Sequence, residues 1–252
     1  MGYRRDDGRV GVRNHVAVTP TPVAASSVAR GIADGVGAWG KATPHQMGTT
    51  RPPETRSQTE RVLAGIGQNP NVGAALVVEL GTEETDAADL ADRIARNGTP
   101  VDTLSIRDVG GTSAALEAGT ATLDELNEEA STARREEADA NELVFAAECG
   151  GSDATSGIAA NPAVGKACDR LVRDGGTASF SETPEFIGDH AIDEAVEYGA
   201  RASASGVSLV DARTADPTDL VAAVRDVADG AATCAEGHGL TEFAITRVGP
   251  SM

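Results

Sequence analysis

Short apolar runs alternate with amphipathic stretches along most of this 252-residue chain, and this alternation restricts the fold more than any other feature. Apolar runs between turn residues predict strands, and apolar residues at every third or fourth position predict helices. We expect strands at residues 15–18, 38–43, 74–80, 101–106, 143–147, 178–180, 207–210 and 243–248. We expect helices at residues 22–36, 53–66, 85–96, 113–138 (as one or two helices), 162–173, 189–200 and 220–228.

The alternation of strand and helix predicts an α/β fold. Its strands form a mainly parallel sheet with right-handed crossovers, in a Rossmann-like arrangement of three layers. Residues 74–80 form the clearest strand. They lack the alternation of apolar and polar residues that is typical of a strand with one face exposed to solvent, so both faces are expected to be covered. Residues 143–147 are also apolar and are predicted to form a buried strand.

An acidic stretch at residues 124–142 separates two strand–helix blocks. It is either a domain boundary or one long surface helix, and we favour the boundary. We therefore divide the chain into blocks 1–140 and 141–252. The length accommodates either one large α/β domain or two smaller ones.

The chain has 39 acidic and 21 basic residues and a net charge of −18, and its only lysines are Lys41 and Lys166. Such an acidic, lysine-poor surface is typical of proteins in a high-salt cytoplasm, where carboxylates keep the molecule hydrated. Without a basic stripe, nucleic acid is an unsuitable partner. No apolar run is long enough to span a membrane, so a cytoplasmic location is expected.

The three cysteines, Cys149, Cys168 and Cys234, are widely spaced and form no CxxC pair. An odd number of distant cysteines argues against both a disulfide framework and a thiolate zinc site.

Polar residues follow the predicted strands at the points where they end. In a parallel sheet these ends share the carboxyl edge, where open α/β sheets bind ligands. The sequence therefore predicts a small-molecule site formed by six strand ends. The polar segments are residues 19–22, 43–51, 79–84, 107–112, 149–163 and 181–185.

The fifth segment, CGGSDATSGIAANPA at residues 149–163, changes abruptly from an apolar strand to a thiol, glycines, hydroxyls and a carboxylate. A turn needs only two or three residues, so a polar loop of this length indicates contact with a ligand.

Several residues have two interpretations. His45 is either a surface histidine or a ligand or acid–base group, and Cys149 is either a small core residue or part of the site. Glu182 and Glu185 either begin a helix, or bind a divalent cation or exchange protons. The Gly-Gly-Thr turns at residues 110–112 and 175–177 favour tight connections over phosphate binding, and a nucleotide-binding module is the weakest reading.

Five motifs occur in an order that resembles the large catalytic region of the altronate and galactarate dehydratase family, and sulfolactate sulfo-lyase large subunits resemble the same region. The motifs are GYRRDDGRVGVRN (residues 2–14), NPNVG (69–73), the segment at 149–163, GGT (175–177) and SETPE (181–185).

The resemblance implies a hydro-lyase that removes water from a sugar acid to give a 2-keto-3-deoxy product. It also implies a divalent metal, typically iron(II), and a separate small, SAF-like subunit, and we expect a homo-oligomer. Loss of the proton alpha to a carboxylate creates an enolate-like dianion, which cations or hydrogen-bond donors must stabilise.

The resemblance assigns roles to residues in three groups. The catalytic candidates are His45, Cys149, Ser152, Asp153 and Glu182. The substrate-binding candidates are Arg9, Arg13, Asn14 and Asn161. The metal-binding candidates are His45, Glu83 and Glu185.

The chain departs from the family pattern at two positions: Thr49 and Thr82 stand where relatives usually have cysteine. It also has no counterpart of a glycine- and lysine-rich block that relatives carry downstream of His190. These departures favour a second hypothesis, a non-catalytic sugar-acid-binding or regulatory paralogue.

Overall fold

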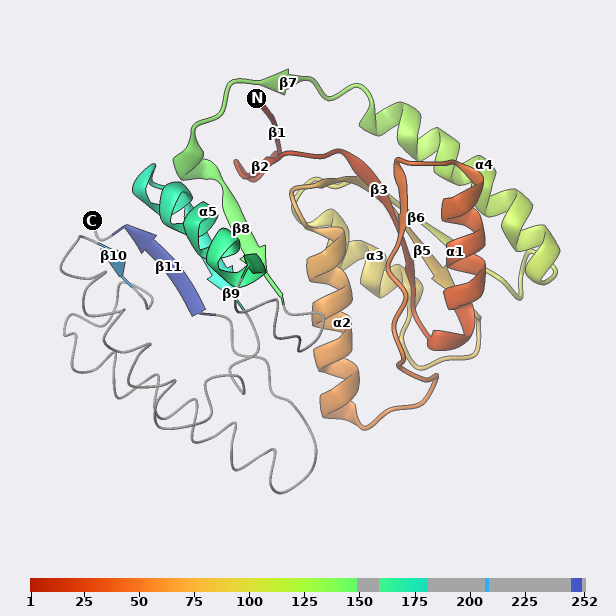
Figure 1. The fold of residues 1–252 in the computed structure, drawn as a ribbon. Helices are drawn as coiled ribbons and strands as arrows, with labels where there is room; N and C mark the ends of the chain where they lie inside the picture. The colour runs from red at the N-terminus through yellow and green to blue at the C-terminus, as the bar shows by residue number, and fades with distance from the viewer. Residues whose placement is uncertain (149–158, 181–206, 209–245, 251–252) are drawn as a thin grey trace. The chain divides into compact units, whose positions relative to one another are not determined.

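The structure, a computed structural model, describes residues 1–148, 159–180, 207–208 and 246–250. The chain divides into two compact units, Met1–Ala138 and Asp139–Met252 (Figure 1). The sequence places the boundary between its two blocks at residue 140.

The first unit is built around a four-stranded parallel sheet. In the order β4-β3-β5-β6, its strands are Gly40–Ala42, His15–Pro20, Val72–Glu79 and Val101–Ser105. All three neighbouring pairs are parallel; Val18 of β3 lies beside Leu76 of β5, for example. The predicted parallel α/β architecture is therefore confirmed.

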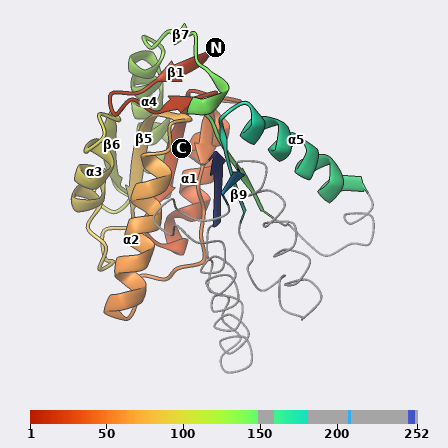
Figure 2. The ribbon, with the colours of Figure 1, turned by 90° about the vertical axis from the view of Figure 1, so that its left-hand side faces the viewer.

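Helices cover both faces of this sheet. Helices α1 (Ser26–Gly35, after a 3-10 turn at Val23–Ala25) and α4 (Thr112–Ala130) pack on one face, and α2 (Pro53–Gly67) and α3 (Ala87–Ala95) pack on the other (Figures 1 and 2). Successive side chains of a strand point to opposite faces. Leu76 accordingly belongs to the core under α1 and α4, and Val77 to the core under α2 and α3. This packing gives the expected three layers.

A small antiparallel sheet, absent from the predicted elements, joins the two ends of the first unit. Strand β1 (Gly2–Arg4) pairs with β2 (Val10–Gly11) on one side and with β7 (Arg135–Glu136) on the other. The prediction of helix throughout residues 113–138 is therefore wrong beyond α4. There, backbone pairing with β1 replaces the helical hydrogen bonds.

The second unit contains a separate sheet. Strand β8 (Val144–Ala147) runs parallel to β9 (Thr177–Phe180), and α5 (Asn161–Arg173) lies between them in the chain. Strand β11 (Thr246–Pro250) is antiparallel to β9 and to β10 (Val207–Ser208). A short 3-10 turn, η2 (Ala140–Glu142), precedes β8. The predicted helices at 189–200 and 220–228 lie outside the described residues.

The prediction that residues 143–147 form a buried strand is wrong in its burial. Val144 is 70% exposed and Phe145 is 41% exposed. Strand β8 is the last strand in the order β10-β11-β9-β8. An apolar run has the same composition at the edge of a sheet as at its centre, so the pattern alone did not distinguish the two positions.

Among the described residues, no helix is long and apolar enough to cross a bilayer.

Candidate functional site

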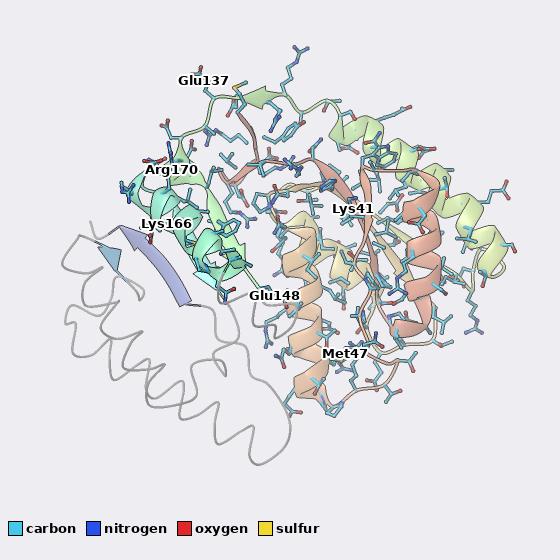
Figure 3. The ribbon with its side chains drawn as sticks, in the orientation of Figure 1. Lys41, Met47, Glu137, Glu148, Lys166 and Arg170 are labelled. Carbon is cyan, nitrogen blue, oxygen red and sulfur yellow. The ribbon has the colours of Figure 1, made fainter. Side chains whose placement is uncertain are left out.

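Polar side chains gather at the carboxyl edge of the first unit's sheet. We call Thr21, His45, Arg51, Glu79 and Glu83 the carboxyl-edge cluster. They come from the segments that follow β3 and β4 and from the end of β5 and the loop beyond it. Met47, labelled in Figure 3, lies at the same edge, and its carbonyl accepts a hydrogen bond from the Val23 N–H at 2.6 Å.

Glu83 organises the loop at residues 80–86, which connects β5 to α3. Its carboxylate accepts four hydrogen bonds, from the Thr21 hydroxyl and from the backbone N–H groups of Leu80 (2.8 Å), Gly81 (2.9 Å) and Thr82 (2.8 Å). Burial opposes ionisation of Glu83, but these hydrogen bonds outweigh it and lower the pKa of the carboxyl below its ordinary value. Glu83 is therefore a carboxylate whose two oxygens are both engaged by the protein.

His45 is held by the backbone at both ring nitrogens. The Met47 N–H donates to Nδ1 at 3.1 Å, so Nε2 carries the proton and donates to the Pro20 carbonyl at 2.8 Å. Burial lowers the pKa of His45, and the Arg51 charge lowers it further against the opposing effect of the Pro20 hydrogen bond. The ring is therefore neutral, in a defined tautomer and orientation.

Glu79, the last residue of β5, is a functional candidate that the sequence reasoning did not select. Burial, and then the charge of Glu83, raise the pKa of the Glu79 carboxyl above its ordinary value, although the Ala87 N–H donates to it. Two neighbouring carboxyl groups with pKa values shifted in opposite directions are typical of acid–base sites. A signal was present: Glu79 is the only charged residue in the apolar run 74–80.

Arg51 is a second functional candidate that was not selected from the sequence. It is the only fully charged residue in the loop at residues 43–52, between β4 and α2, and only 7% of it is exposed. Its backbone N–H donates to Glu84 Oε2 at 3.3 Å, and its Nη2 donates to Thr85 Oγ1 at 2.7 Å. Its Nε and Nη1 are buried and have no hydrogen-bond partner among the described residues.

The three substrate-binding candidates of the first unit engage protein groups. Arg9 pairs with Asp7 (Nη2 to Oδ2, 2.6 Å) and also donates to the carbonyl of Gln68. Asn14 Nδ2 donates to the carbonyl of Ala130 at 2.8 Å. Arg13 is exposed, and its Nη1 donates to the backbone carbonyl of the preceding residue at 3.1 Å.

These candidates lie at the opposite edge of the sheet from the carboxyl-edge cluster. Asn14 immediately precedes β3, whereas the last residue of β3, Pro20, contacts His45. Five steps of about 3.3 Å along β3 separate the two edges by roughly 17 Å. The structure therefore does not bring Arg9, Arg13 and Asn14 together with His45 and Glu83.

Two of the sequence motifs form this opposite edge by binding each other. The side-chain oxygen of Asn71 accepts hydrogen bonds from the N–H groups of Val12 (2.8 Å) and Arg13 (3.0 Å). At Gly11 the chain passes so close to Pro70 that an added Cβ would lie 1.8 Å from the Pro70 carbonyl oxygen. The segments at residues 2–14 and 69–73 thus have a structural role.

In the second unit, Asn161 is exposed at the first residue of α5. The remaining candidates, Cys149, Ser152, Asp153, Glu182 and Glu185, lie outside the described residues. The expectation of six strand ends on one edge is wrong, because the strands belong to separate sheets. Four ends (β3 to β6) share one sheet, and those of β8 and β9 belong to the other.

The described residues do not fit the divalent metal that the resemblance implies. The nitrogens of His45 and the oxygens of Glu83 are already engaged by hydrogen bonds. Within the described ranges, no group of three or more His, Cys, Asp or Glu side chains is arranged to hold a metal. The iron(II) site thus remains a prediction involving Glu185, outside those ranges.

The first unit is an α/β fold, and its carboxyl-edge cluster lies at the edge where open parallel sheets generally bind ligands. Comparison with known families is more specific. Residues 2–131 match the family model described as D-galactarate dehydratase/Altronate hydrolase, second domain, and residues 140–193 match that of D-galactarate/Altronate dehydratase, C-terminal. The chain belongs to the altronate and galactarate dehydratase family.

Three curated relatives illustrate the similarity. A (2R)-sulfolactate sulfo-lyase subunit beta from Chromohalobacter salexigens is 38% identical over 75% of this chain and 47% of the relative. The altronate dehydratase of Bacillus subtilis is 31% identical over 76% of this chain and 40% of its own length. That of Escherichia coli is 32% identical over 77% and 42%, respectively. The chain therefore spans less than half the length of each relative.

Proposed function

We propose that this chain is the large or core subunit of a sugar-acid dehydratase, a carbon–oxygen lyase that converts an acid such as altronate or galactarate to a 2-keto-3-deoxy product. The observation that carries the proposal is the match of both family models, in order, to residues 2–131 and 140–193. The carboxyl-edge cluster adds acid–base groups at the edge where such folds bind ligands.

The reaction needs a base to take the proton alpha to the carboxylate and an acid to protonate the departing β-hydroxyl, which leaves as water. The resulting enol then tautomerises to the 2-keto acid. Glu79, whose raised pKa favours the protonated form, suits the acid role. His45 is neutral, and it can take up a proton at Nδ1 once the hydrogen bond from the Met47 N–H is broken. Glu83 holds the surrounding loop in shape.

We further propose that the active enzyme has more than one kind of subunit. The name of the Chromohalobacter relative describes it as one subunit of its enzyme, and this chain covers 47% of that subunit. A small SAF-like partner and a homo-oligomeric core are the assemblies to test. The charge of −18 and the scarcity of lysine support a location in a high-salt cytoplasm.

The test is an activity assay of the full chain, alone and with a small subunit of the same family, at high and low salt. Altronate, galactarate and sulfolactate serve as substrates, with and without iron(II) under anaerobic conditions. Formation of a 2-keto-3-deoxy acid from altronate or galactarate supports the proposal. No turnover in any combination, by folded protein, would refute it.

A second function, sugar-acid binding without catalysis, is favoured by Thr49 and Thr82, which stand where the family resemblance leads us to expect cysteine. Calorimetry distinguishes the two functions. Binding of altronate or galactarate that is independent of metal, in the absence of turnover, supports the paralogue. A lyase rate that falls in Glu79→Gln excludes it.

A further inference from the structure

The guanidinium of Arg51 is buried, and no carboxylate of the described residues compensates its charge. No acidic side chain in the described part of the chain forms an ion pair with it within 4.0 Å. Two nearby carboxylates have other cationic partners: Glu84 pairs with Arg56 at 3.5 Å, and Glu60 pairs with Arg93 at 3.3 Å. A positive charge is thus kept away from water beside the neutral ring of His45.

Leaving charged donors buried without acceptors is unfavourable, and proteins rarely do so without a functional reason. A guanidinium presents two edges that bind a carboxylate, Nε with Nη2 and Nη1 with Nη2. Nη2 of Arg51 donates one of its two hydrogens to Thr85, whereas Nε and Nη1 donate none to any residue that the structure describes. One complete edge therefore remains available for a planar anion.

We infer that Arg51 binds the substrate carboxylate, at the edge of the sheet where Glu79 and His45 lie. This inference rests on the proposed function, which supplies a carboxylate substrate. A carboxylate held by the guanidinium gains two charge-assisted hydrogen bonds and neutralises the buried charge. It also places the adjacent carbon, whose proton is removed, near the acid–base groups.

Entry of the ligand requires the loop at residues 43–52 to move, because Nε and Nη1 are shielded from solvent. Among its connections to the rest of the unit are two backbone hydrogen bonds, from Val23 N–H to the Met47 carbonyl at 2.6 Å and from Glu84 N–H to the Thr49 carbonyl at 3.2 Å. Neither of the two belongs to the hydrogen bonds of the sheet.

The experiment measures binding to the full chain by calorimetry. The probes are galactarate, altronate and galactitol, the last being the polyol of galactarate without its carboxylates. The variants are Arg51→Met, Arg51→Lys and the control Arg61→Met, which removes the same charge from an exposed position on α2. We expect the wild type and the control to bind both acids but not galactitol, and both Arg51 variants to bind the acids at least tenfold more weakly.

Urea unfolding separates binding from a structural role. A methionine in place of an uncompensated buried charge should leave the unfolding midpoint unchanged or raise it. The inference would be overturned if Arg51→Met unfolded at a lower urea concentration than the wild type while Arg51→Lys still bound the acids. So would wild-type affinity in either Arg51 variant, or failure of the wild type to bind any acid.

The outcomes also separate this inference from the proposed function. Arg51-dependent binding without turnover refutes the dehydratase but keeps the carboxylate site. Turnover with acid binding unchanged in both variants keeps the dehydratase and removes the site.

Discussion

Substitution of Glu83 by glutamine tests whether this residue organises the loop after β5 or binds a metal. The carboxylate accepts four hydrogen bonds, and glutamine keeps one acceptor oxygen for two of them. In place of the other oxygen the glutamine has an amide NH2 group, which cannot accept a hydrogen bond from the remaining two donors. A hydrogen bond to a charged group contributes about 1.5–3 kcal/mol, and partial exposure of the loop favours the lower value. The loss of two such bonds should therefore cost about 3 kcal/mol.

The assay is urea unfolding followed by the fluorescence of Trp39, the only tryptophan, which packs on the core of the first unit. With a slope of about 2 kcal/mol per molar urea, the midpoint should fall by about 1.5 M. Since the pKa of Glu83 is lowered in the folded state, its stabilisation is present above the ordinary value of 4.5 and is lost as pH falls through the folded pKa. The difference between wild type and variant should shrink accordingly.

Glu128→Gln is the matched control, because it removes the same charge from an exposed position on α4. If Glu83→Gln unfolds at the same urea concentration as this control, Glu83 does not organise the loop. If that variant also loses a bound divalent metal that the control retains, Glu83 is a metal ligand instead.

Three further predictions concern the two edges of the sheet. Asn71→Ala removes the acceptor of two backbone N–H groups and should cost about 1–2 kcal/mol in urea unfolding, whereas Asn71→Asp should cost less because it keeps the oxygens. Gly11→Ala places a Cβ against the Pro70 carbonyl and should cost about 3 kcal/mol or more, and a midpoint equal to wild type would contradict this close approach. Glu79 has a raised pKa, so wild-type stability should fall as pH rises from its ordinary value of 4.5 through the folded pKa. Glu79→Gln should therefore gain stability relative to wild type over that interval, and a difference independent of pH would show that Glu79 titrates normally.

Much of the first unit was predictable from local sequence. The apolar run at residues 74–80 indicates a strand covered on both faces, and β5 is the central strand on which both layers of helices pack. Parallel strands end at one edge, so the positions of His45 and Glu83 at the carboxyl edge also followed from strand order. These features depend on the spacing of apolar residues and on the order of strands and helices along the chain, and both can be read from the sequence.

The functional meaning of individual residues was decided by tertiary structure. Arg9 and Asn14 belong to a motif that suggested substrate binding, but the fold places them at the other edge, where they contact protein groups. Whether a carboxylate or a guanidinium is free to act depends on which donors and acceptors surround it. Both oxygens of Glu83 are engaged, whereas two donor nitrogens of Arg51 have no partner among the described residues. Some of the groups around them, such as Thr21 beside Glu83 and Thr85 beside Arg51, come from segments distant in sequence. By itself, therefore, the sequence determined the parallel α/β architecture of the first unit and the resemblance to the family, and only the folded chain decided which polar groups remain available for chemistry.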